Sequence, residues 1–122
     1  MAHVKRCFFI GRVKREISRM PEPVKSGFGF AFFMAQTGGE ADNVKALKGF
    51  GGRAVLEVIE DHGGDTYRAV YTVRFADAVY VVHAFQKKSK SGIATPKHEI
   101  ELIKTRLKEA EELYRTLVAE GE

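Results

Sequence analysis

Residues 54–86 read AVLEVIEDHGGDTYRAVYTVRFADAVYVVHAFQ, and this stretch decides the fold. It holds three runs rich in Val, Ile, Leu and Tyr, separated by two short turn clusters. Because short turns join antiparallel neighbours, the runs predict a β-meander. The third run is apolar on both faces, which is typical of a central strand covered on two sides. The predicted strands are residues 54–60, 66–75 and 78–86.

The chain before this meander predicts one strand and two helices. Residues 3–10 end in Cys-Phe-Phe-Ile, which is typical of a short strand, and residues 12–19 predict a short basic helix that stops before Pro21. Pro23 can open a second helix, which would end at Gly38. Its apolar residues recur at helical spacing, and they are Val24, Phe28, Ala31, Phe32 and Ala35.

Two glycines weaken the prediction of the second helix. Gly27 and Gly29 each cost about 1 kcal/mol relative to alanine inside a helix, and the run FGFAFF at residues 28–33 could also be a buried strand. The apolar stripe continues beyond both glycines, so we expect the helix. The two helical segments would then form a helical hairpin.

The C-terminal segment predicts the longest helix. Thr95 is a suitable N-cap, and Pro96 would then occupy the first helical position. One apolar face follows from Ile100, Ile103, Leu107, Ala110, Tyr114 and Leu117. The order of strand, two helices, three strands and helix is an α+β fold. Since no linker divides the chain, we expect a single domain over residues 1–122.

Composition limits the classes of protein that fit. With 122 residues, of which 44% are hydrophobic and 30% charged, the chain can bury one core without disulfides, and a disordered protein is excluded. The apolar stretches are too short for a signal peptide or a membrane span, and a single cysteine fits a reducing compartment. We therefore expect a cytoplasmic protein with no membrane contact.

Charge is distributed unevenly along the chain, whose formal net charge is +4. Residues 108–122 hold two cations and five acids, which leaves 18 Lys and Arg against 11 Asp and Glu, or +7, on residues 1–107. A basic body of this kind suits a polyanionic ligand. An ordinary solvated surface with an excess of lysine would give the same count.

No metal or nucleotide site is predicted. The single cysteine, Cys7, lies in an apolar run, and the four histidines lack the spacing of metal ligands. They are His3, His62, His83 and His98. The glycines at residues 27–29 and 49–52 match neither the dinucleotide nor the P-loop pattern, so they indicate loop and packing positions.

The residues that could carry chemistry begin in the second strand of the meander. Arg68 stands between apolar neighbours, where a guanidinium either pairs with a carboxylate, such as Glu57 or Glu60, or faces an anion-binding cleft. His83, in the third strand, is either a core histidine with satisfied hydrogen bonds or a proton-transfer group.

Three lysines follow the last predicted strand. Lys87, Lys88 and Lys90 place ammonium groups at the end of a central strand. Such a run usually lies on a solvated surface, but loops at strand ends are also where sites are built.

These segments resemble a known family. The motifs are KGFG at residues 48–51, DTYRAVY at residues 65–71, FADAVYVVHAFQKKSK at residues 75–90 and TPK at residues 95–97. Together they closely resemble the phage-derived HigB-like branch of the RelE/ParE toxin superfamily, over about residues 45–108. The block ending in HAFQKKSK is specific to this branch, whereas the YRxxY strand is shared more widely.

The resemblance implies the toxin of a type II toxin–antitoxin system. Such a toxin is a ribosome-dependent mRNA endoribonuclease, or mRNA interferase, that inhibits translation, and its RelE-like fold packs a helical hairpin on a small antiparallel sheet. The resemblance also implies the ribosome and mRNA as targets, a cognate helix-turn-helix antitoxin as partner, and no metal or small-molecule cofactor.

The resemblance also assigns roles to individual residues. Arg68 matches the arginine of the YRxxY strand, which touches the region of the scissile phosphate. Lys87 and Lys88 match a basic pair that serves the same phosphate, with lysine where RelE has arginine in the second place. His83 completes the catalytic set that we expect. The candidate RNA-binding residues are Lys48, Arg53 and Lys90.

Two departures from RelE affect the acid–base chemistry. Residues 56–58 are Leu, Glu and Val where RelE has lysines, and Ala94 falls near the position of a RelE tyrosine. Other groups must then take the proton from the ribose 2′-OH and protonate the leaving 5′ oxygen. The groups available are His83, His98, Tyr71 and Tyr80.

Two other functions fit the same residues. A ParE-like inhibitor of DNA gyrase would need no proton-transfer groups. A non-catalytic basic module would bind RNA or an antitoxin without chemistry.

Overall fold

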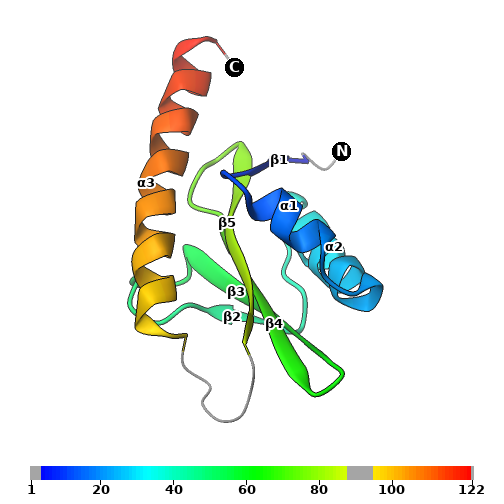
Figure 1. Cartoon of the computed structure of the whole chain (residues 1–122). Helices are drawn as coiled ribbons and strands as arrows, with labels where there is room; N and C mark the ends of the chain where they lie inside the picture. The colour runs from blue at the N-terminus through cyan, green and yellow to red at the C-terminus, as the bar shows by residue number, and fades with distance from the viewer. Residues whose placement is uncertain (1–3, 88–94, 122) are drawn as a thin grey trace.

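The computed structural model describes residues 4–87 and 95–121, which form a five-stranded sheet and three helices (Figure 1). The strands are β1 (Arg6–Phe9), β2 (Val44–Ala46), β3 (Val55–His62), β4 (Asp65–Thr72) and β5 (Ala78–Lys87). The helices are α1 (Val13–Ser18), α2 (Glu22–Gln36) and α3 (Lys97–Ala119). The order of strands across the sheet is β1-β5-β4-β3-β2.

The predicted β-meander is confirmed. β3, β4 and β5 pair antiparallel in chain order. In the turn between β3 and β4, Gly63 and Gly64 have φ angles of 60° and 86°, which glycine adopts without the steric cost of a side chain. β5 lies between β1 and β4 and is buried along most of its length, as expected of a strand covered on both faces.

Two features of the sheet differ from the prediction. β1 pairs parallel with β5, so the sheet is mixed and not wholly antiparallel. This pairing joins residues 72 positions apart in the chain, such as Arg6 and Ala78, and no local pattern encodes it. β2 is a three-residue edge strand that is not among the predicted strands, because so short a strand leaves no periodic signal.

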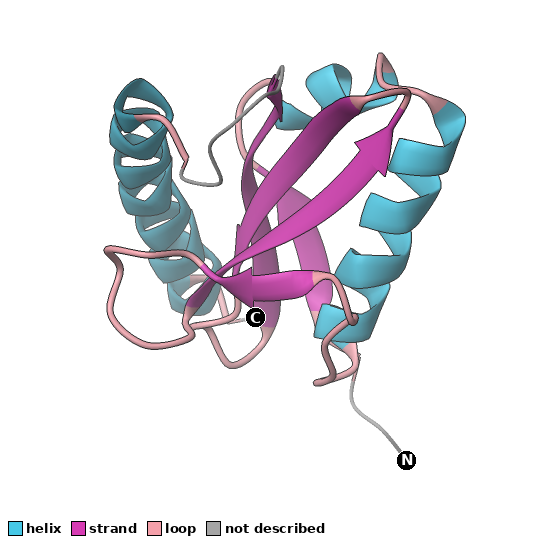
Figure 2. Ribbon diagram, turned by 90° about the horizontal axis from the view of Figure 1, so that it is seen from below, coloured by secondary structure: helices cyan, strands magenta, loops and turns pink. Residues whose placement is uncertain are grey.

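Helices cover both faces of the sheet and give the molecule three layers (Figure 2). α1 and α2 pack on one face, around a core that includes Val24, Phe28 and Phe32. α3 packs on the other face, where Ile103 and Leu107 are buried. We call these two sides of the sheet the hairpin face and the α3 face.

α2 continues as a helix through both glycines, so a buried strand at residues 28–33 is wrong. Gly27 faces the sheet, and a Cβ atom at this position would collide with the carboxylate of Glu60. The missing side chain therefore makes room for that carboxylate, which accepts a hydrogen bond of 2.7 Å from Asn43 Nδ2. Gly29 has open space around it.

α3 begins one residue later than predicted, and Thr95 does not cap it. Pro96 occupies the N-cap position, and the hydroxyl of Thr95 instead donates to Glu57 Oε2 at 2.9 Å. A carboxylate is a strong acceptor, and this one lies on the sheet face that α3 covers. The predicted apolar side of α3 does face the sheet.

Among the described residues, no helix combines the length and apolar character that a bilayer crossing requires.

Candidate functional site

The buried polar side chains of the described residues gather on the α3 face, and they are Glu57, Arg68, Thr72 and His83. In the register of β4 and β5, Arg68 lies opposite Phe85. His83 and Lys87 stand two residues before and after Phe85, and side chains on a strand alternate between faces. The structure therefore brings Arg68, His83 and Lys87 to one face of the sheet.

Arg68 is paired with a buried carboxylate. Its Nη1 lies 3.3 Å from Glu57 Oε1 and 3.4 Å from Glu57 Oε2, and the two side chains are only 5% and 1% exposed. Of the two partners that the sequence suggests, Glu57 is the one used, while Glu60 binds Asn43. Thr95 also donates to Glu57, which ties the start of α3 to this pair. An anion that reaches Arg68 must compete with Glu57.

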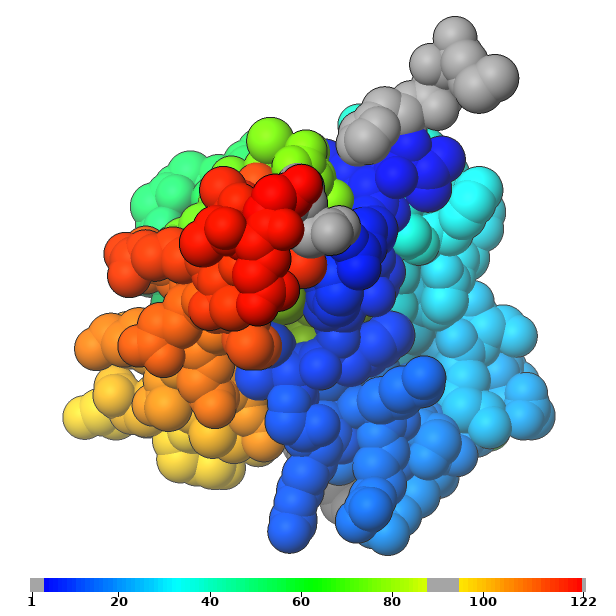
Figure 3. Space-filling view, turned by 90° about the horizontal axis from the view of Figure 1, so that it is seen from above, coloured from blue at the N-terminus to red at the C-terminus, as the bar shows by residue number. Residues whose placement is uncertain are grey.

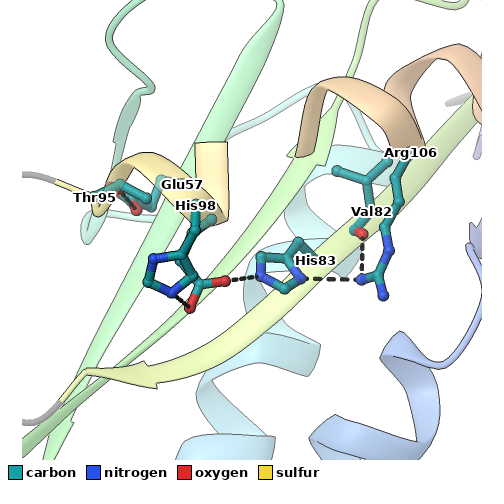
Figure 4. Close-up of polar contacts among 7 residues, drawn as sticks. Glu57, Val82, His83, Thr95, His98 and Arg106 are labelled. Carbon is teal, nitrogen blue, oxygen red and sulfur yellow. Dashed lines mark hydrogen bonds and ion pairs between the residues drawn. The ribbon is translucent and has the colours of Figure 1, made fainter. Parts of the chain in front are cut away.

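His83 is held by two residues of α3 (Figure 4). Its Nε2 lies 2.5 Å from Glu99 Oε1, and its Nδ1 lies 3.0 Å from Arg106 Nη1. A guanidinium only donates hydrogen bonds, so Nδ1 is the acceptor and Nε2 carries the proton that is donated to Glu99. Arg106 Nη1 also donates to the carbonyl of Val82 at 3.1 Å. Both ring nitrogens of His83 are therefore engaged, and the ring is fixed in orientation.

Glu99 links His83 to a second histidine at the surface. Glu99 Oε2 lies 3.4 Å from His98 Nε2, and the His98 side chain is 80% exposed whereas that of Glu99 is 18% exposed. A row of polar groups thus runs from His98 through Glu99 and His83 to Arg106 (Figure 4). Within this row, His98 is the imidazole that a substrate can reach directly.

Two of the predicted RNA-binding residues, Lys48 and Arg53, lie in the loop between β2 and β3. Lys48 is exposed in the turn after β2. Arg53 is exposed as well, and its Nη2 lies 2.5 Å from Glu40 Oε2. It lines a hollow of about 320 Å³ beside Leu56 and Val73, which pack on the hairpin face. Lys88, expected in the catalytic set, and Lys90 lie outside the described residues.

The two candidate tyrosines, Tyr71 and Tyr80, are buried, and Cys7 is partly buried. Tyr71 lies on the hairpin face, where burial and then the charge of Glu40 raise its pKa to about 12. Tyr80 lies on the α3 face, stacked on Phe8, and burial raises its pKa. Burial also raises the pKa of the Cys7 thiol to about 11. These groups keep their protons at neutral pH, so the histidines are the better candidates for proton transfer.

Sequence reasoning misses Glu99 and Arg106, although a signal for them exists. They stand four residues before and three residues after Ile103, so a helix places them on the same side as this buried residue. Charged residues on the buried side of a helix need partners on the surface that they cover. That requirement points to polar groups on the sheet, of which His83 is one.

The α3 face holds two of the cations that the sequence predicts for the site. Among residues 4–87 and 95–121, no three His, Cys, Asp or Glu side chains gather as metal ligands would. The face instead carries the guanidinium of Arg68, with Lys87 on the same side of the sheet. Such cations form strong, charge-assisted hydrogen bonds with phosphates. The neighbouring imidazoles and Glu99 supply groups for proton transfer.

A protein-family model described as "Phage derived protein Gp49-like (DUF891)" matches residues 15–108. The chain belongs to this Gp49-like family. The match begins within α1 and ends within α3, so it contains β2 to β5 and the residues of the α3 face described above. Comparisons with curated proteins and with solved structures give no match. The kinship of this Gp49-like chain with RelE and ParE stays a prediction.

Proposed function

We propose that this Gp49-like chain is the toxin of a type II toxin–antitoxin pair and that it cuts mRNA on the ribosome without a metal cofactor. The observation that carries the proposal is the presence of Arg68, His83 and Lys87 on one face of the sheet. Membership of a phage-derived family and the resemblance of residues 45–108 to HigB-like toxins support it.

The proposed reaction needs only proton transfer and charge stabilisation. A base takes the proton from a ribose 2′-OH, the 2′ oxygen attacks the adjacent phosphorus, and an acid protonates the 5′ oxygen as its bond to phosphorus breaks. The products are a 2′,3′-cyclic phosphate and a 5′-OH. Arg68, Lys87 and Lys88 would stabilise the negative charge that builds up on the phosphate.

We assign proton transfer to the exposed His98, which Glu99 links to the buried His83. His98 is exposed and can approach a ribose, while His83 is buried and orients the carboxylate of Glu99. An imidazole can serve as base or acid at cellular pH. General acid–base help contributes about 10²- to 10⁴-fold, so alignment of the 2′-OH by the ribosome would supply much of the remaining acceleration.

The ion pair of Arg68 explains why free RNA would be a poor substrate. In this structure the guanidinium of Arg68 forms an ion pair with Glu57, and Glu57 also accepts a hydrogen bond from Thr95. A phosphate must displace this carboxylate to bind Arg68. RNA that binds weakly would therefore gain little stabilisation of its phosphate from Arg68. An mRNA strand positioned by the ribosome would place its phosphate there at high effective concentration.

We also propose that a helix-turn-helix antitoxin binds this chain. The second half of α3 supports a docking surface there, because Leu113 and Val118 are 53% and 51% exposed and acidic residues surround them. The first half of α3, by contrast, packs on the sheet through Ile103 and Leu107.

A purified translation system tests the nuclease proposal. Ribosomes carrying a defined mRNA are incubated with the protein, and primer extension maps the new 5′ ends. We expect cuts in the ribosomal A site, cyclic-phosphate ends, and no cutting of the same mRNA without ribosomes. Lys87→Ala and His98→Ala should each slow cutting at least ~10-fold, whereas the exposed α3 control Lys108→Ala should not.

The same protein is incubated in parallel with DNA gyrase and supercoiled DNA. Intact mRNA together with gyrase-dependent DNA breaks would replace the nuclease proposal with a ParE-like one. Intact mRNA and intact DNA would leave the hypothesis of a non-catalytic binding module.

A further inference from the structure

We infer that the exposed side of α1 is a second binding surface for the phosphate backbone of RNA, outside the α3-face site. This inference deepens the proposed function, because a ribosome-dependent nuclease needs a grip on RNA other than the strand that it cuts. None of its residues belongs to the predicted RNA contacts.

Residues 12–19 carry four cations and one acid. The cations are Arg12, Lys14, Arg15 and Arg19, and all four are exposed. Within the described part of the chain, none of them has an acidic partner, although Lys25 nearby is paired with Glu22 at 2.8 Å. Unpaired cations that crowd one short helix repel one another, and a polyanion relieves that repulsion.

Three of the four cations line a hollow. It has a volume of about 700 Å³ and is lined by Gly11, Arg12, Lys14, Arg15 and Ser18. Gly11 has a φ of 57° and no side chain, so β1 turns directly into α1 and this end of the hollow stays open. In the space-filling view, the segment around α1, coloured blue, projects from the body of the molecule beside α2 and α3 (Figure 3).

The two sides of α1 have different roles. Val13 and Ile17 are buried and anchor the helix to the hairpin-face core, so the backbone beneath the cations is fixed. The ring of Phe9 lies 5.8 Å from Lys14 Nζ, which adds a cation–π contact to that side chain. Cations on a rigid support lose less conformational freedom on binding than cations on a loose loop.

RNA is the occupant that the chemistry favours over a small anion. Arg12, Arg15 and Arg19 follow one another at spacings of three and four residues. Arg15 lies within α1 and the other two are its cap residues, so the three align along one side of this segment. A line of guanidinium groups matches a row of phosphates, and arginine binds phosphate through two parallel hydrogen bonds. The hollow is open to solvent, which suits a backbone that lies across it.

The test is direct binding, which does not depend on cleavage. A fluorescein-labelled RNA hairpin and purified small ribosomal subunits serve as two separate probes, and affinity is measured over a range of salt concentrations. The variant is Arg12→Gln/Arg15→Gln, and its control is Lys104→Gln/Lys108→Gln, which removes the same charge from the exposed side of α3. All four positions are exposed, and circular dichroism verifies that both variants fold.

We expect the α1 variant to bind at least one probe ~10-fold or more weakly. The slope of log affinity against log salt concentration should become shallower by about 0.7–0.9 for each phosphate that the variant no longer neutralises. The control should change affinity less than ~3-fold, because a general reduction of charge acts only at long range. Equal effects in the two variants would overturn the inference, as would an unchanged affinity for both probes. Weakened antitoxin binding with normal RNA binding would assign α1 to a protein partner and would overturn it too.

The outcome is separable from that of the proposed function. A wild-type protein that cuts no mRNA but binds RNA through α1 would refute the nuclease and keep this surface. If removal of the α1 cations changed neither the cutting of mRNA nor the affinity for RNA, the nuclease proposal would stand and the α1 surface would be refuted.

Discussion

The hairpin face and the α3 face of the same sheet are built on different principles. Among the described residues, the core packed against α1 and α2 contains the hydroxyls of Tyr67 and Tyr71 but no buried charged side chain. The α3 face buries Glu57, Arg68, Thr72 and His83 among its valines. A core does not need buried charges, and ion pairs in such places are seldom more stabilising than apolar side chains. The gathering of Glu57, Arg68 and His83 beneath the first turns of α3 is therefore consistent with the proposed site on this face, whereas the hairpin face indicates packing.

The largest expected effect comes from breaking the ion pair of the α3 face. Glu57→Gln leaves the buried guanidinium of Arg68 without this carboxylate, and such a change costs about 3–5 kcal/mol. Urea denaturation at neutral pH measures the loss of stability. The matched control is Glu40→Gln, which breaks the exposed pair with Arg53 and should cost at most about 1 kcal/mol.

Replacing both charges together sharpens the same point. Glu57→Leu combined with Arg68→Met should recover most of the lost stability, since a well-packed apolar pair is often as stable as a buried ion pair. A double variant as unstable as Glu57→Gln would mean that the polar layer is needed for the fold. It would then carry no information about function.

The hairpin face should be sensitive to alkaline pH. Burial raises the pKa of Cys7 from 9.0 to about 11 and that of Tyr71 from 10.0 to about 12. The folded protein holds both protons more tightly than the unfolded chain does. The stabilisation is therefore complete below the unfolded pKa values and is lost as the pH rises through the folded ones, over about pH 9 to 12.

Tyr71→Phe isolates one half of this effect. In the described part of the chain, the Tyr71 hydroxyl has no hydrogen-bond partner, so its removal should cost little at neutral pH. Denaturant titration across this pH range measures the free energy of unfolding. In the variant, the loss of stability at the upper end of the range should be smaller. An unchanged alkaline profile in the variant would show that Tyr71 ionises no less easily in the folded protein than in the unfolded chain.

A smaller effect is expected where α3 meets the ion pair. Thr95→Ala removes the hydroxyl that donates to Glu57 and should cost about 1.5 kcal/mol, since the acceptor is charged. Thr95→Asp separates this role from helix capping. Aspartate is a good N-cap, but here it would place a second carboxylate against Glu57, so it should destabilise more than alanine. Thermal unfolding measures both variants. A higher melting temperature for Thr95→Asp than for the unmodified protein would show that residue 95 caps α3 after all.

Periodic patterns predicted most of the fold. The apolar stripes of α2 and α3 and the runs of β3, β4 and β5 each repeat over enough residues to identify the element and its buried side. The parallel pairing of β1 with β5 could not be predicted in this way, because it depends on where the whole chain folds back.

The site was less predictable than the fold. The alternatives for Arg68 included Glu57, yet only the register of β3 and β4 decides between Glu57 and Glu60. His83 was a candidate from its place in an apolar strand, but its two partners come from α3. Which polar groups meet across layers is set by the packing of a helix on a sheet, and the sequence shows only that each needs a partner.

The smallest effect concerns the contact between the Glu60 carboxylate of β3 and Gly27 of α2. Gly29→Ala should stabilise the protein by about 1 kcal/mol, because alanine is the better helix former and nothing lies within 4 Å of the added Cβ. Gly27→Ala gains the same helix propensity but pushes the carboxylate of Glu60 away, which breaks the hydrogen bond from Asn43 and removes a similar amount. The net change in stability for Gly27→Ala should be close to zero.

In an Asn43→Ala background that hydrogen bond is already absent, so Gly27→Ala should stabilise nearly as much as Gly29→Ala. Thermal unfolding of these variants decides the matter: equal gains at both glycines in the unmodified chain would mean that Gly27 is not needed to seat Glu60.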